Sequence, residues 1–510
     1  MNAVRRLHLG VDIGTSSCKV VAVDQEGAVV STATRGYPLH SPRHGWSEQD
    51  PEDWWAATSA CVRQITTALP QLGDEVVAIG LSGQMHGLVV LDADDHILRR
   101  AILWNDQRCE AECQAVTEAI GGPAQVLNEI DNRLITGYTA GKIAWLHDHE
   151  PDKFRRTRKI LNPKDFLRLR MTGQFATEVS DASGTGLFDV ANRRWSPAML
   201  DAVGIPESLL PTVVESPDST GGLLPEVARH WGLSEDVQVY GGGGDAVVQT
   251  ASMGVVKPGD IGVTVGTAGV VAAVAETCPE NSGNVQVSCY NAPGLWHIMG
   301  VSLSAAGALQ WFTDVLNELP SSPDVGFPAI IDLAKDIPAG ADGLLFLPYL
   351  AGERSPHYAP AATAAMLGLT RMHGLGHMVR AVIEGALLNM REILDAFADL
   401  NIPCERVIAS GGATRDPFWL QTMADVFGIE VVTMTGSSEG GAYGAALVAG
   451  VGAGTWSSFD AVYKHLQVSA RFLPDRHTAD RYDRIYAGYR NLYGHLAAVY
   501  DDIKIARGDE

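Results

Sequence analysis

The chain has 510 residues, of which 46% are hydrophobic and 19% are charged, so it is globular in composition and long enough for at least two domains. Its 60 acidic and 38 basic residues give a net charge of −22, which argues against nucleic acid or an anionic membrane as the main partner. The seven cysteines form no Cys-x-x-Cys pair, no apolar run approaches the length of a membrane span, and the N-terminus has no apolar signal region. We therefore expect a cytoplasmic protein in a reducing compartment.

The first predicted element is a β-hairpin over residues 9–23, in which apolar strands flank a short polar tip. The tip carries one acid, a flexible glycine, two hydroxyls and one cation: Asp12, Gly14, Thr15, Ser16 and Lys19. A phosphate that binds through a metal ion requires this mixture, because the carboxylate holds the metal while amides, hydroxyls and the lysine contact the phosphate oxygens. The sequence therefore predicts a metal-linked phosphate site at this tip, with Asp12 as the metal ligand.

The hairpin pattern recurs over residues 261–274, about half the chain length further on. Four residues keep their type and spacing, because Gly10, Val11, Gly14 and Thr15 reappear as Gly262, Val263, Gly266 and Thr267. Thr264 stands in the place of Asp12, and Lys19 has no counterpart. We interpret the repeat as an internal duplication in which only the first copy kept the acid and the cation; chance similarity of two short hairpins is the alternative. The boundary is expected near residue 253, which gives domains 1–253 and 254–510.

Strands and helices alternate along the rest of the chain, which predicts an α/β architecture. A helix is expected over residues 51–69, with proline at its first position. The strand expected over 76–81 leads into the polar turn 84–87, whose alternative interpretation is a buried turn with a hydrogen-bonded histidine. Tyrosines at helical spacing over 480–500 predict a closing helix whose aromatic stripe packs against the domain.

Glycine-rich turns follow predicted strands at five places: 14–16, 241–244, 266–269, 411–413 and 440–441. Together they indicate a cleft in which backbone amides approach phosphates, although no P-loop sequence is present. Asp245 follows one of these turns at the expected start of a helix. The helix dipole keeps a carboxylate ionised there and ready to accept a proton, so Asp245 is a candidate general base; a plain helix N-cap is the alternative.

The motifs occur in an order that resembles the sugar kinases of the FGGY family over nearly the whole chain. The resemblance rests on the hairpin at 12–15 and on seven further segments: 46–51, 83–87, 104–108, 163–165, 180–185, 348–357 and 411–413. Two more segments look like family signatures: Lys142 with Trp145, and 368–370 leading to 380–385. Each motif is weak alone, whereas the ordered set is highly specific.

This resemblance implies two ribonuclease-H-like domains of the actin and hexokinase type, with a catalytic cleft between them. It implies ATP and Mg²⁺, with Asp245 as the base that takes the proton from the sugar hydroxyl and Asp12 near the metal. The sugar-binding residues would come mainly from the first domain: Trp46, Gln84, Met85, His86 and Asp245. The nucleotide-binding residues would come from both hairpins and from later turns: Gly14, Thr15, Ser16, Lys19, Gly266, Thr267, Gly411, Gly412, Ala413, Gly440 and Gly441.

The implied reaction is ATP-dependent phosphorylation of a ketopentose, with D-xylulose as the expected substrate. Two positions depart from the pattern of family members that act on this sugar: Ala246 stands where they usually carry Asn, and Ala268 where they usually carry Ser. The first departure removes an amide that would bind the sugar. The alternatives are another ketose, a polyol or a sugar acid (ribulose, L-xylulose, glycerol, gluconate), or a non-catalytic ATP- and sugar-binding protein of the same fold. The expected partners are the sugar and ATP, with no nucleic acid or membrane, and a homodimer stays open.

Overall fold

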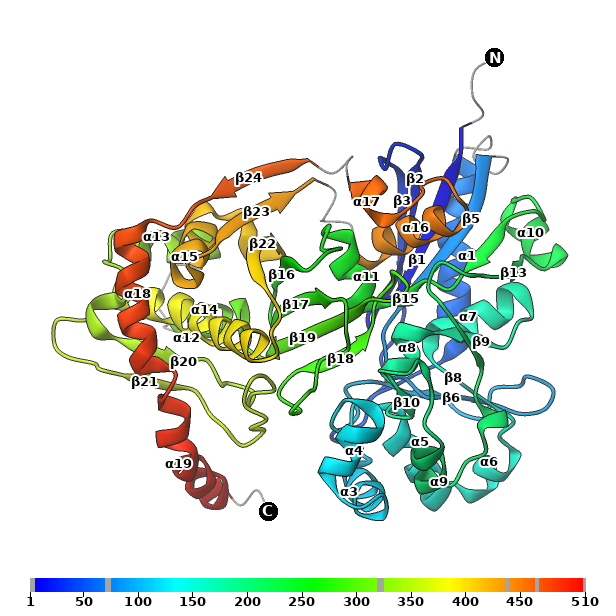
Figure 1. The fold of residues 1–510 in the computed structure, drawn as a ribbon, viewed down its shortest axis with the longest axis horizontal. Helices are drawn as coiled ribbons and strands as arrows, with labels where there is room; N and C mark the ends of the chain where they lie inside the picture. Colours follow the sequence, from blue (N-terminus) through cyan, green and yellow to red (C-terminus); the bar gives the residue numbers. More distant parts are fainter. Residues whose placement is uncertain (1–4, 69–74, 319–324, 436–439, 464–466, 508–510) are drawn as a thin grey trace.

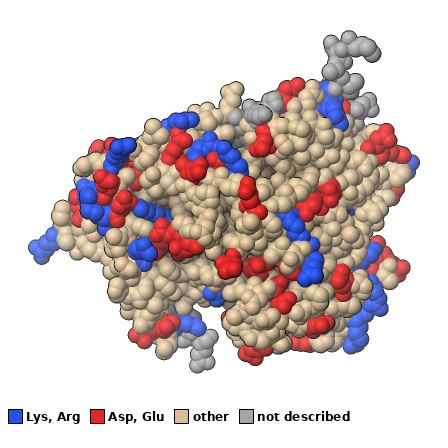
Figure 2. All heavy atoms as spheres, viewed as in Figure 1, with Lys and Arg blue, Asp and Glu red and all other residues tan. Residues whose placement is uncertain are grey.

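The computed structural model describes residues 5–68, 75–318, 325–435, 440–463 and 467–507. Two mixed β-sheets of seven strands each lie side by side, with helices around them (Figure 1). None of the described helices is long and apolar enough to cross a membrane. On the face drawn in Figure 2, acidic and basic side chains are interspersed over both halves, so the net negative charge does not gather in one patch there.

The first sheet has the strand order β13-β14-β5-β1-β2-β3, and β15 pairs with β5. Its strands are β1 (Leu7–Ile13), β2 (Ser17–Asp24), β3 (Val29–Gly36), β5 (Val76–Gly83), β13 (Ser219–Gly222), β14 (Gln238–Tyr240) and β15 (Gly243–Gly244). The predicted hairpin is confirmed, since β1 and β2 pair antiparallel. Side chains alternate between the faces of a strand, so Leu9 and Val11 pack with Trp54 of α1 (Pro51–Ala68), whereas Gly10 faces α16 (Gly440–Gly452). Helices therefore cover both faces of the hairpin, which explains its nearly continuous burial.

The second sheet has the order β18-β19-β17-β16-β22-β23-β24. Its strands are β16 (Gly259–Val265), β17 (Gly269–Ala275), β18 (Gln286–Cys289), β19 (Trp296–Ser302), β22 (Cys404–Ser410), β23 (Glu430–Met434) and β24 (Val468–Phe472). The path β19-β17-β16-β22-β23-β24 repeats the path β3-β2-β1-β5-β14-β13, with the same parallel and antiparallel pairings. Thr264 pairs with Ser410 where Asp12 pairs with Ser82 in the first sheet. The predicted internal duplication is thus confirmed by the topology.

Helices α11 (Asp245–Ser252) and α16 lie between the two sheets. Helix α11 follows the first sheet in sequence, but its Val247 and Ala251 pack with Ile408 and Val432 of the second sheet. Helix α16 follows the second sheet and packs on β1 and β5 of the first. A Cβ atom at Gly444 of α16 would overlap the Val248 oxygen of α11, so glycine permits this close contact. Each half therefore supplies one helix to the sheet of the other half. The domain boundary at residue 253 stays a proposal.

Short helices and two-stranded sheets fill the connections of the first half. They are α3 (Glu110–Ala119), α4 (Pro123–Ile130), α5 (Thr139–His149), α6 (Pro151–Arg156), α7 (Pro163–Thr172), α8 (Val179–Ser183), α9 (Pro197–Val203) and α10 (Pro225–Trp231), with the strand pairs β4 (Glu48–Gln49) and β7 (Ala101–Ile102), β6 (Val89–Leu91) and β8 (Lys159–Leu161), β9 (Ala176–Glu178) and β12 (Thr212–Val214), and β10 (Phe188–Asp189) and β11 (Arg194–Trp195). Five of these helices begin with proline, which fits the first helical position because its missing N–H has no partner there.

The second half is built around the long helix α14 (Leu375–Asp399), which is buried along most of its length. Its other elements are α12 (Ala306–Asn317), α13 (Phe327–Lys335), α15 (Pro417–Phe427), α17 (Phe459–Tyr463), and the strand pair β20 (Leu345–Leu347) and β21 (Ala365–Leu367). The closing helix expected over 480–500 is wrong as one element, because α18 (Arg476–Tyr489) and α19 (Leu492–Arg507) are separated by a break at residues 490–491. Glycine and asparagine near the break lower helix propensity there. The packing role of the tyrosines is confirmed, since Tyr482 and Tyr489 are buried and donate hydrogen bonds to Glu384 and Gly385 of α14.

Candidate active site

The carboxylate of Asp12 lies where three elements meet. Asp12 is paired with Lys19 across the hairpin and with Ser82 of β5, and the Ser82 hydroxyl donates a 2.6 Å hydrogen bond to Asp12 Oδ1. Helix α16 begins directly beside it, because a Cβ atom at Gly441 would lie 3.0 Å from Asp12 Oδ1. Burial raises the pKa of Asp12, opposed by the Ser82 hydrogen bond and the charge of Lys19. Asp12 is therefore a partly buried acid placed against the amino end of a helix, where anions are favoured.

Asp245 is the first residue of α11 and stands next to the same acid. Its Oδ1 accepts a 2.8 Å hydrogen bond from the Ala246 amide, whereas the N-cap position of α11 is Gly244, where no side chain caps the helix. A cap alone lowers the pKa of a carboxyl, but burial and the charge of Asp12 raise the pKa of Asp245 to about 7, against the lowering effect of the Ala246 and Met85 amides. The alternative interpretation of Asp245 as a plain N-cap is therefore wrong, because Gly244 occupies that position and Asp245 is the first helical residue. A carboxyl with a pKa near neutrality is suited to exchange a proton.

The donor set at this point fits a divalent cation. Asp12 and Asp245 are two partly buried acids that repel each other, and a hard cation between or beside them would relieve that repulsion. Magnesium is usually bound by one or two carboxylates together with substrate phosphates, so three protein ligands are not needed. In the part of the chain that the structure describes, the one cluster of three metal-binding side chains (Asp92, Asp94 and His96) lies elsewhere, in a largely exposed turn.

His86 ends the polar turn after β5 in a strained backbone conformation, with φ of 70°. Its Nδ1 lies 2.6 Å from the Gly184 carbonyl oxygen, which can only accept, so Nδ1 carries the proton and Nε2 is free to accept. Burial lowers the pKa of His86 to about 3, and the ring is therefore neutral. The buried Lys142 donates to the His86 carbonyl at 2.9 Å and thereby holds the turn. His86 is thus a fixed hydrogen-bond acceptor for a hydroxyl.

Met85 and His86 line a small enclosed cavity of about 20 Å³. Ala246 lines the same cavity from α11, and Ser288 and His297 line it from the second sheet. Tyr138, Ser183, Gly184, Val247, Gln286, Val287 and Met299 complete the wall. The cavity therefore lies between the two halves of the chain, beside Asp245, and it brings together the predicted sugar-binding residues Met85 and His86 with the unusual Ala246.

Two other predicted sugar-binding residues lie outside this cavity. Gln84 is buried and donates a 2.8 Å hydrogen bond to Gln49, which in turn donates to the Thr15 carbonyl at 2.6 Å. Gln84 thus supports the hairpin tip. Trp46 packs against the Arg108 guanidinium, which lies 3.6 Å from its ring centroid, and edge-on against Trp145. Contact of Gln84 and Trp46 with a sugar stays a prediction.

A larger hollow of about 780 Å³ opens at the second hairpin. Four predicted nucleotide-binding residues line it: Gly266, Thr267, Gly412 and Ala413. Most of its remaining wall comes from α12, α13 and the start of α15: Ala306, Gly307, Gln310, Trp311, Asp314, Phe327, Pro328, Ile331 and Trp419. The sequence analysis missed these helical residues, because an apolar helix face normally indicates core packing. The structure shows that the ring of Trp311 is 41% accessible, and no pattern in the sequence indicates this exposure.

The remaining predicted nucleotide-binding residues are divided between two places. Gly411 lies beside the large hollow with φ of 97°, and a Cβ atom there would come within 2.5 Å of the Val265 oxygen. Gly440 and Gly441 lie instead at the start of α16, where Gly441 lies against Asp12. Gly14, Thr15, Ser16 and Lys19 lie at the first hairpin, where the indole of Trp104 donates to the Thr15 hydroxyl at 3.0 Å. The predicted nucleotide-binding residues therefore lie at two places. One is a hollow large enough for a nucleoside, and the other is the acidic region at Asp12, which is suited to the metal-bound phosphates of a nucleotide.

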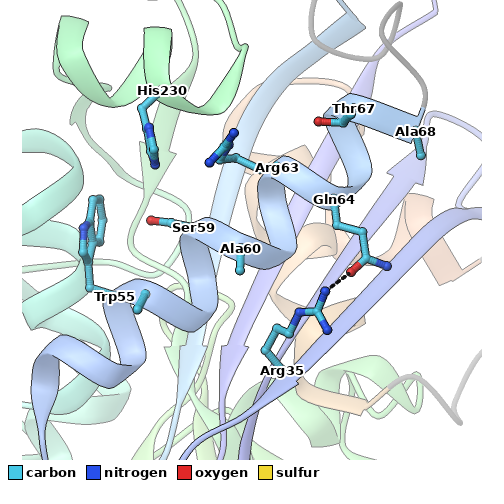
Figure 3. A pocket seen from close by; sticks show the side chains of 10 residues that line it. Arg35, Trp55, Ser59, Ala60, Arg63, Gln64, Thr67, Ala68 and His230 are labelled. Atoms are coloured by element: carbon cyan, nitrogen blue, oxygen red, sulfur yellow. Dashed lines mark hydrogen bonds between the residues drawn. The ribbon is translucent and has the colours of Figure 1, made fainter.

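A third hollow, of about 720 Å³, lies on the outer face of α1. Figure 3 shows Arg35, Trp55, Arg63 and His230 around it, with Arg35 donating to Gln64. None of the predicted site residues is among those that line it. The candidate active site is therefore the region between the two sheets, and size alone does not identify it.

Two sheets of equal topology, each with a glycine-rich hairpin, define the actin and hexokinase class of fold, as predicted. The sequence matches the N-terminal domain of the FGGY family of carbohydrate kinases over residues 7–254 and the C-terminal domain of that family over residues 262–453. The chain belongs to this family, and the resemblance seen in the sequence is confirmed. Carbohydrate kinases transfer a phosphoryl group from ATP, so ATP is a substrate of this class of enzyme.

Full-length relatives are similar throughout. The xylulose kinase of Escherichia coli (strain K12) is 39% identical over 498 residues, covering 96% of this chain and 99% of the relative. The xylulose kinase of Bacillus subtilis (strain 168) is 35% identical over 501 residues, covering 98% and 99%. The crystal structure of xylulose kinase from Rhodospirillum rubrum superposes with a TM-score of 0.91 at 29% identity, covering 97% of this chain and 100% of that one.

Proposed function

We propose that this chain transfers the γ-phosphoryl group of ATP to D-xylulose and forms D-xylulose 5-phosphate. The observation that carries the reaction is the position of Asp245, a carboxyl with a pKa of about 7 that stands between the acid Asp12 and the cavity lined by Met85 and His86. The choice of sugar is supported by the two full-length relatives reported above, both of which are xylulose kinases.

The proposed chemistry needs one base and no covalent enzyme intermediate. The sugar hydroxyl oxygen attacks the γ-phosphorus while its proton passes to the Asp245 carboxylate. A new oxygen–phosphorus bond forms, and the bond between the γ-phosphorus and the ADP oxygen breaks, so ADP leaves with the electron pair. Most of the rate enhancement then comes from holding the two substrates in line.

This chain's own residues supply the positioning. His86 Nε2 would accept a sugar hydroxyl, and the contact of Lys142 with the His86 carbonyl keeps the ring in place. Asp12 would hold Mg²⁺, which supplies positive charge to the phosphate oxygens of ATP. The cavity lined by Met85 and His86 takes its walls from both halves of the chain, so closure of the halves around the substrates would exclude water and limit hydrolysis of ATP.

A second candidate substrate is favoured by one observation, the methyl group of Ala246 in the sugar cavity. A cavity of about 20 Å³ with Ser288, His297 and His86 in its wall has the size and polarity to hold one water molecule. If water replaces the missing amide, D-xylulose remains the substrate. If a substituent of the sugar enters this space, another ketose, a polyol or a sugar acid becomes the preferred substrate.

The reaction is tested by measuring ADP release with D-xylulose, D-ribulose, L-xylulose, glycerol and gluconate. We expect the highest kcat/KM for D-xylulose, and a tenfold advantage of another compound would reject this sugar. Asp245→Asn keeps the shape of the base but cannot take the proton, so kcat should fall by about 10²–10⁴-fold. Calorimetry should show that the variant still binds the sugar. Near-normal turnover of the variant would remove Asp245 from the mechanism, and ADP release without any dependence on sugar would favour a non-catalytic binding protein.

A further inference from the structure

The general base follows a run of four glycines, residues 241–244, and this run has little intrinsic rigidity. Close packing requires glycine here: a Cβ atom at Gly242 would overlap the Leu81 oxygen, and one at Gly244 would lie 2.6 Å from the Met85 side chain. Glycine has the largest backbone freedom of any residue. The position of Asp245 therefore depends on contacts that hold the glycine run from outside.

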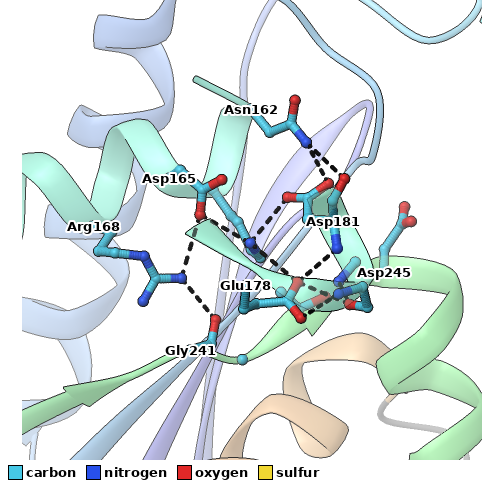
Figure 4. Close-up of polar contacts among 12 residues, drawn as sticks. Asn162, Asp165, Arg168, Glu178, Asp181, Gly241 and Asp245 are labelled. Carbon is cyan, nitrogen blue, oxygen red and sulfur yellow. Dashed lines mark hydrogen bonds and ion pairs between the residues drawn. The ribbon is translucent and has the colours of Figure 1, made fainter. Parts of the chain in front are cut away.

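Two side chains of the first half hold the run at its ends (Figure 4). Arg168 of α7 donates to the carbonyl oxygens of Tyr240 at 3.0 Å and Gly241 at 2.7 Å. At the other end, the Gly244 amide donates to the hydroxyl of Ser180 at 3.0 Å. Gly244 directly precedes Asp245, so the Ser180 contact is the side-chain contact nearest to the base along the chain.

Ser180 can hold Gly244 because its own hydroxyl is oriented. The Ser180 hydroxyl donates to Glu178 Oε1 at 2.8 Å, and the Ser180 amide donates to Glu178 Oε2 at 2.7 Å. A serine hydroxyl has one proton, and this proton is committed to Glu178, so a lone pair is left to face the Gly244 amide. Ser180 is fully buried, and water therefore does not compete for this geometry.

Glu178 is in turn fixed by a buried charge cluster, the group Lys164, Asp165, Arg168, Glu178 and Asp181 (Figure 4). Lys164 Nζ lies 2.9 Å from Asp165, 3.0 Å from Asp181 and 3.4 Å from Glu178. Buried ion clusters are weak sources of stability, because desolvation offsets the attraction between the charges. The hydrogen bonds of Arg168, and those of Glu178 through Ser180, lead from this cluster to residues 240–244. This arrangement indicates that the cluster fixes the position of the glycine run.

We propose that Ser180 is a positioning residue for phosphoryl transfer: its hydroxyl, oriented by Glu178, fixes the Gly244 amide and so holds the Asp245 carboxylate toward the sugar. This inference rests on the proposed role of Asp245 as the base. It adds a residue that touches neither sugar nor nucleotide and acts through the backbone of the glycine run.

The chain offers a matched control at Ser196. This serine is also buried, its hydroxyl donates to Glu129 Oε2 at 2.8 Å, and it accepts the Met199 amide at 3.2 Å. Ser180→Ala and Ser196→Ala therefore remove the same pair of contacts, one to a glutamate and one from an amide. Only the contacts of Ser180 reach the residue next to Asp245, because Ser180 accepts the amide of Gly244.

The experiment measures kcat, both KM values and the melting temperature of the two variants. Ser180→Ala should lower kcat by about 10- to 100-fold, because a small displacement of a catalytic group has a large effect on rate, while the KM for MgATP changes by less than about twofold. Ser196→Ala should keep wild-type kcat, with a melting temperature lowered by a similar amount. If Ser180→Ala proves too unstable, Arg168→Lys is the second variant; it keeps the charge beside Asp165 but cannot span both carbonyl oxygens, and the same loss of kcat is expected.

The outcomes separate this inference from the proposed function. If Asp245→Asn is inactive and Ser180→Ala turns over as fast as Ser196→Ala, the positioning role is wrong while the base stands. If Asp245→Asn retains turnover, the proposed function fails and this inference fails with it. The positioning role would also be overturned if kcat falls in step with the melting temperature to the same extent in both serine variants. That result is expected when a residue contributes only to stability.

Discussion

The ionisation of Asp245 should set the lower pH limit of activity. The base must be ionised, and burial together with the charge of Asp12 raises its pKa from the usual value near 4 to about 7. The protonated, inactive form is therefore populated from about pH 7 downward. The ionised fraction falls tenfold per pH unit below the pKa, so kcat/KM at pH 6 should be about one tenth of its plateau value.

Four neighbouring groups shift the pKa of Asp245. Asp12 and Asp181 raise the pKa of Asp245 by their charges, whereas the amides of Ala246 and Met85 lower it. Burial raises the pKa of Asp181 itself to about 7, so Asp181 carries its charge only in the upper part of the acid limb, the pH range in which activity falls as Asp245 is protonated. Asp181→Asn removes that charge, so the acid limb should move slightly to lower pH. Asp260→Asn is the control: burial also raises the pKa of this carboxyl, but Arg406 is its partner, in the second sheet, and the acid limb should not move.

The assay follows ADP release as a function of D-xylulose concentration between pH 5 and 9, at MgATP below its KM, because kcat/KM then reports the free enzyme. A wild-type profile that stays flat down to pH 5 would refute the reasoning about Asp245. An acid limb that moves to higher pH in Asp181→Asn would contradict the assigned sign of the Asp181 charge. Equal movement in Asp260→Asn would mean that the shift is not local.

Two further predictions concern the metal and the sugar. Asp12→Ala should abolish Mg²⁺-dependent nucleotide use while calorimetry still detects the sugar; loss of sugar affinity with MgATP affinity intact would reverse the assignment. Ala246→Asn should lower the KM for D-xylulose, since one neutral hydrogen bond contributes about 0.5–1.5 kcal/mol, or up to about tenfold in affinity, with kcat nearly unchanged. A higher KM for D-xylulose, measured beside the wild type on the same sugar panel, would show that the cavity is adapted to another substrate.

Several features of the site depend on contacts between distant parts of the chain, which local sequence patterns do not indicate. The family resemblance places Gln84 at the sugar, and this contact stays a prediction; the structure shows its side chain donating to Gln49, which in turn contacts the hairpin tip. Gly441 was grouped with the nucleotide-binding turns, but it lies against Asp12. Ser180 belonged to a recognised motif with no role attached. Its contact with Gly244 joins residues 64 positions apart, and no periodicity in the sequence indicates it.

The sequence by itself determined the two hairpins, the internal repeat, the α/β class and membership in the FGGY family. These follow from short-range signals: strand periodicity, turn residues and motifs read in order. Only the tertiary structure decided that α11 and α16 cross between the sheets, that Asp12 and Asp245 share one electrostatic site, and that Trp311 lines the large hollow. The physical reason is that these contacts join segments far apart in the chain. The packing of whole sheets and helices, and not any local pattern, sets the distance between such segments.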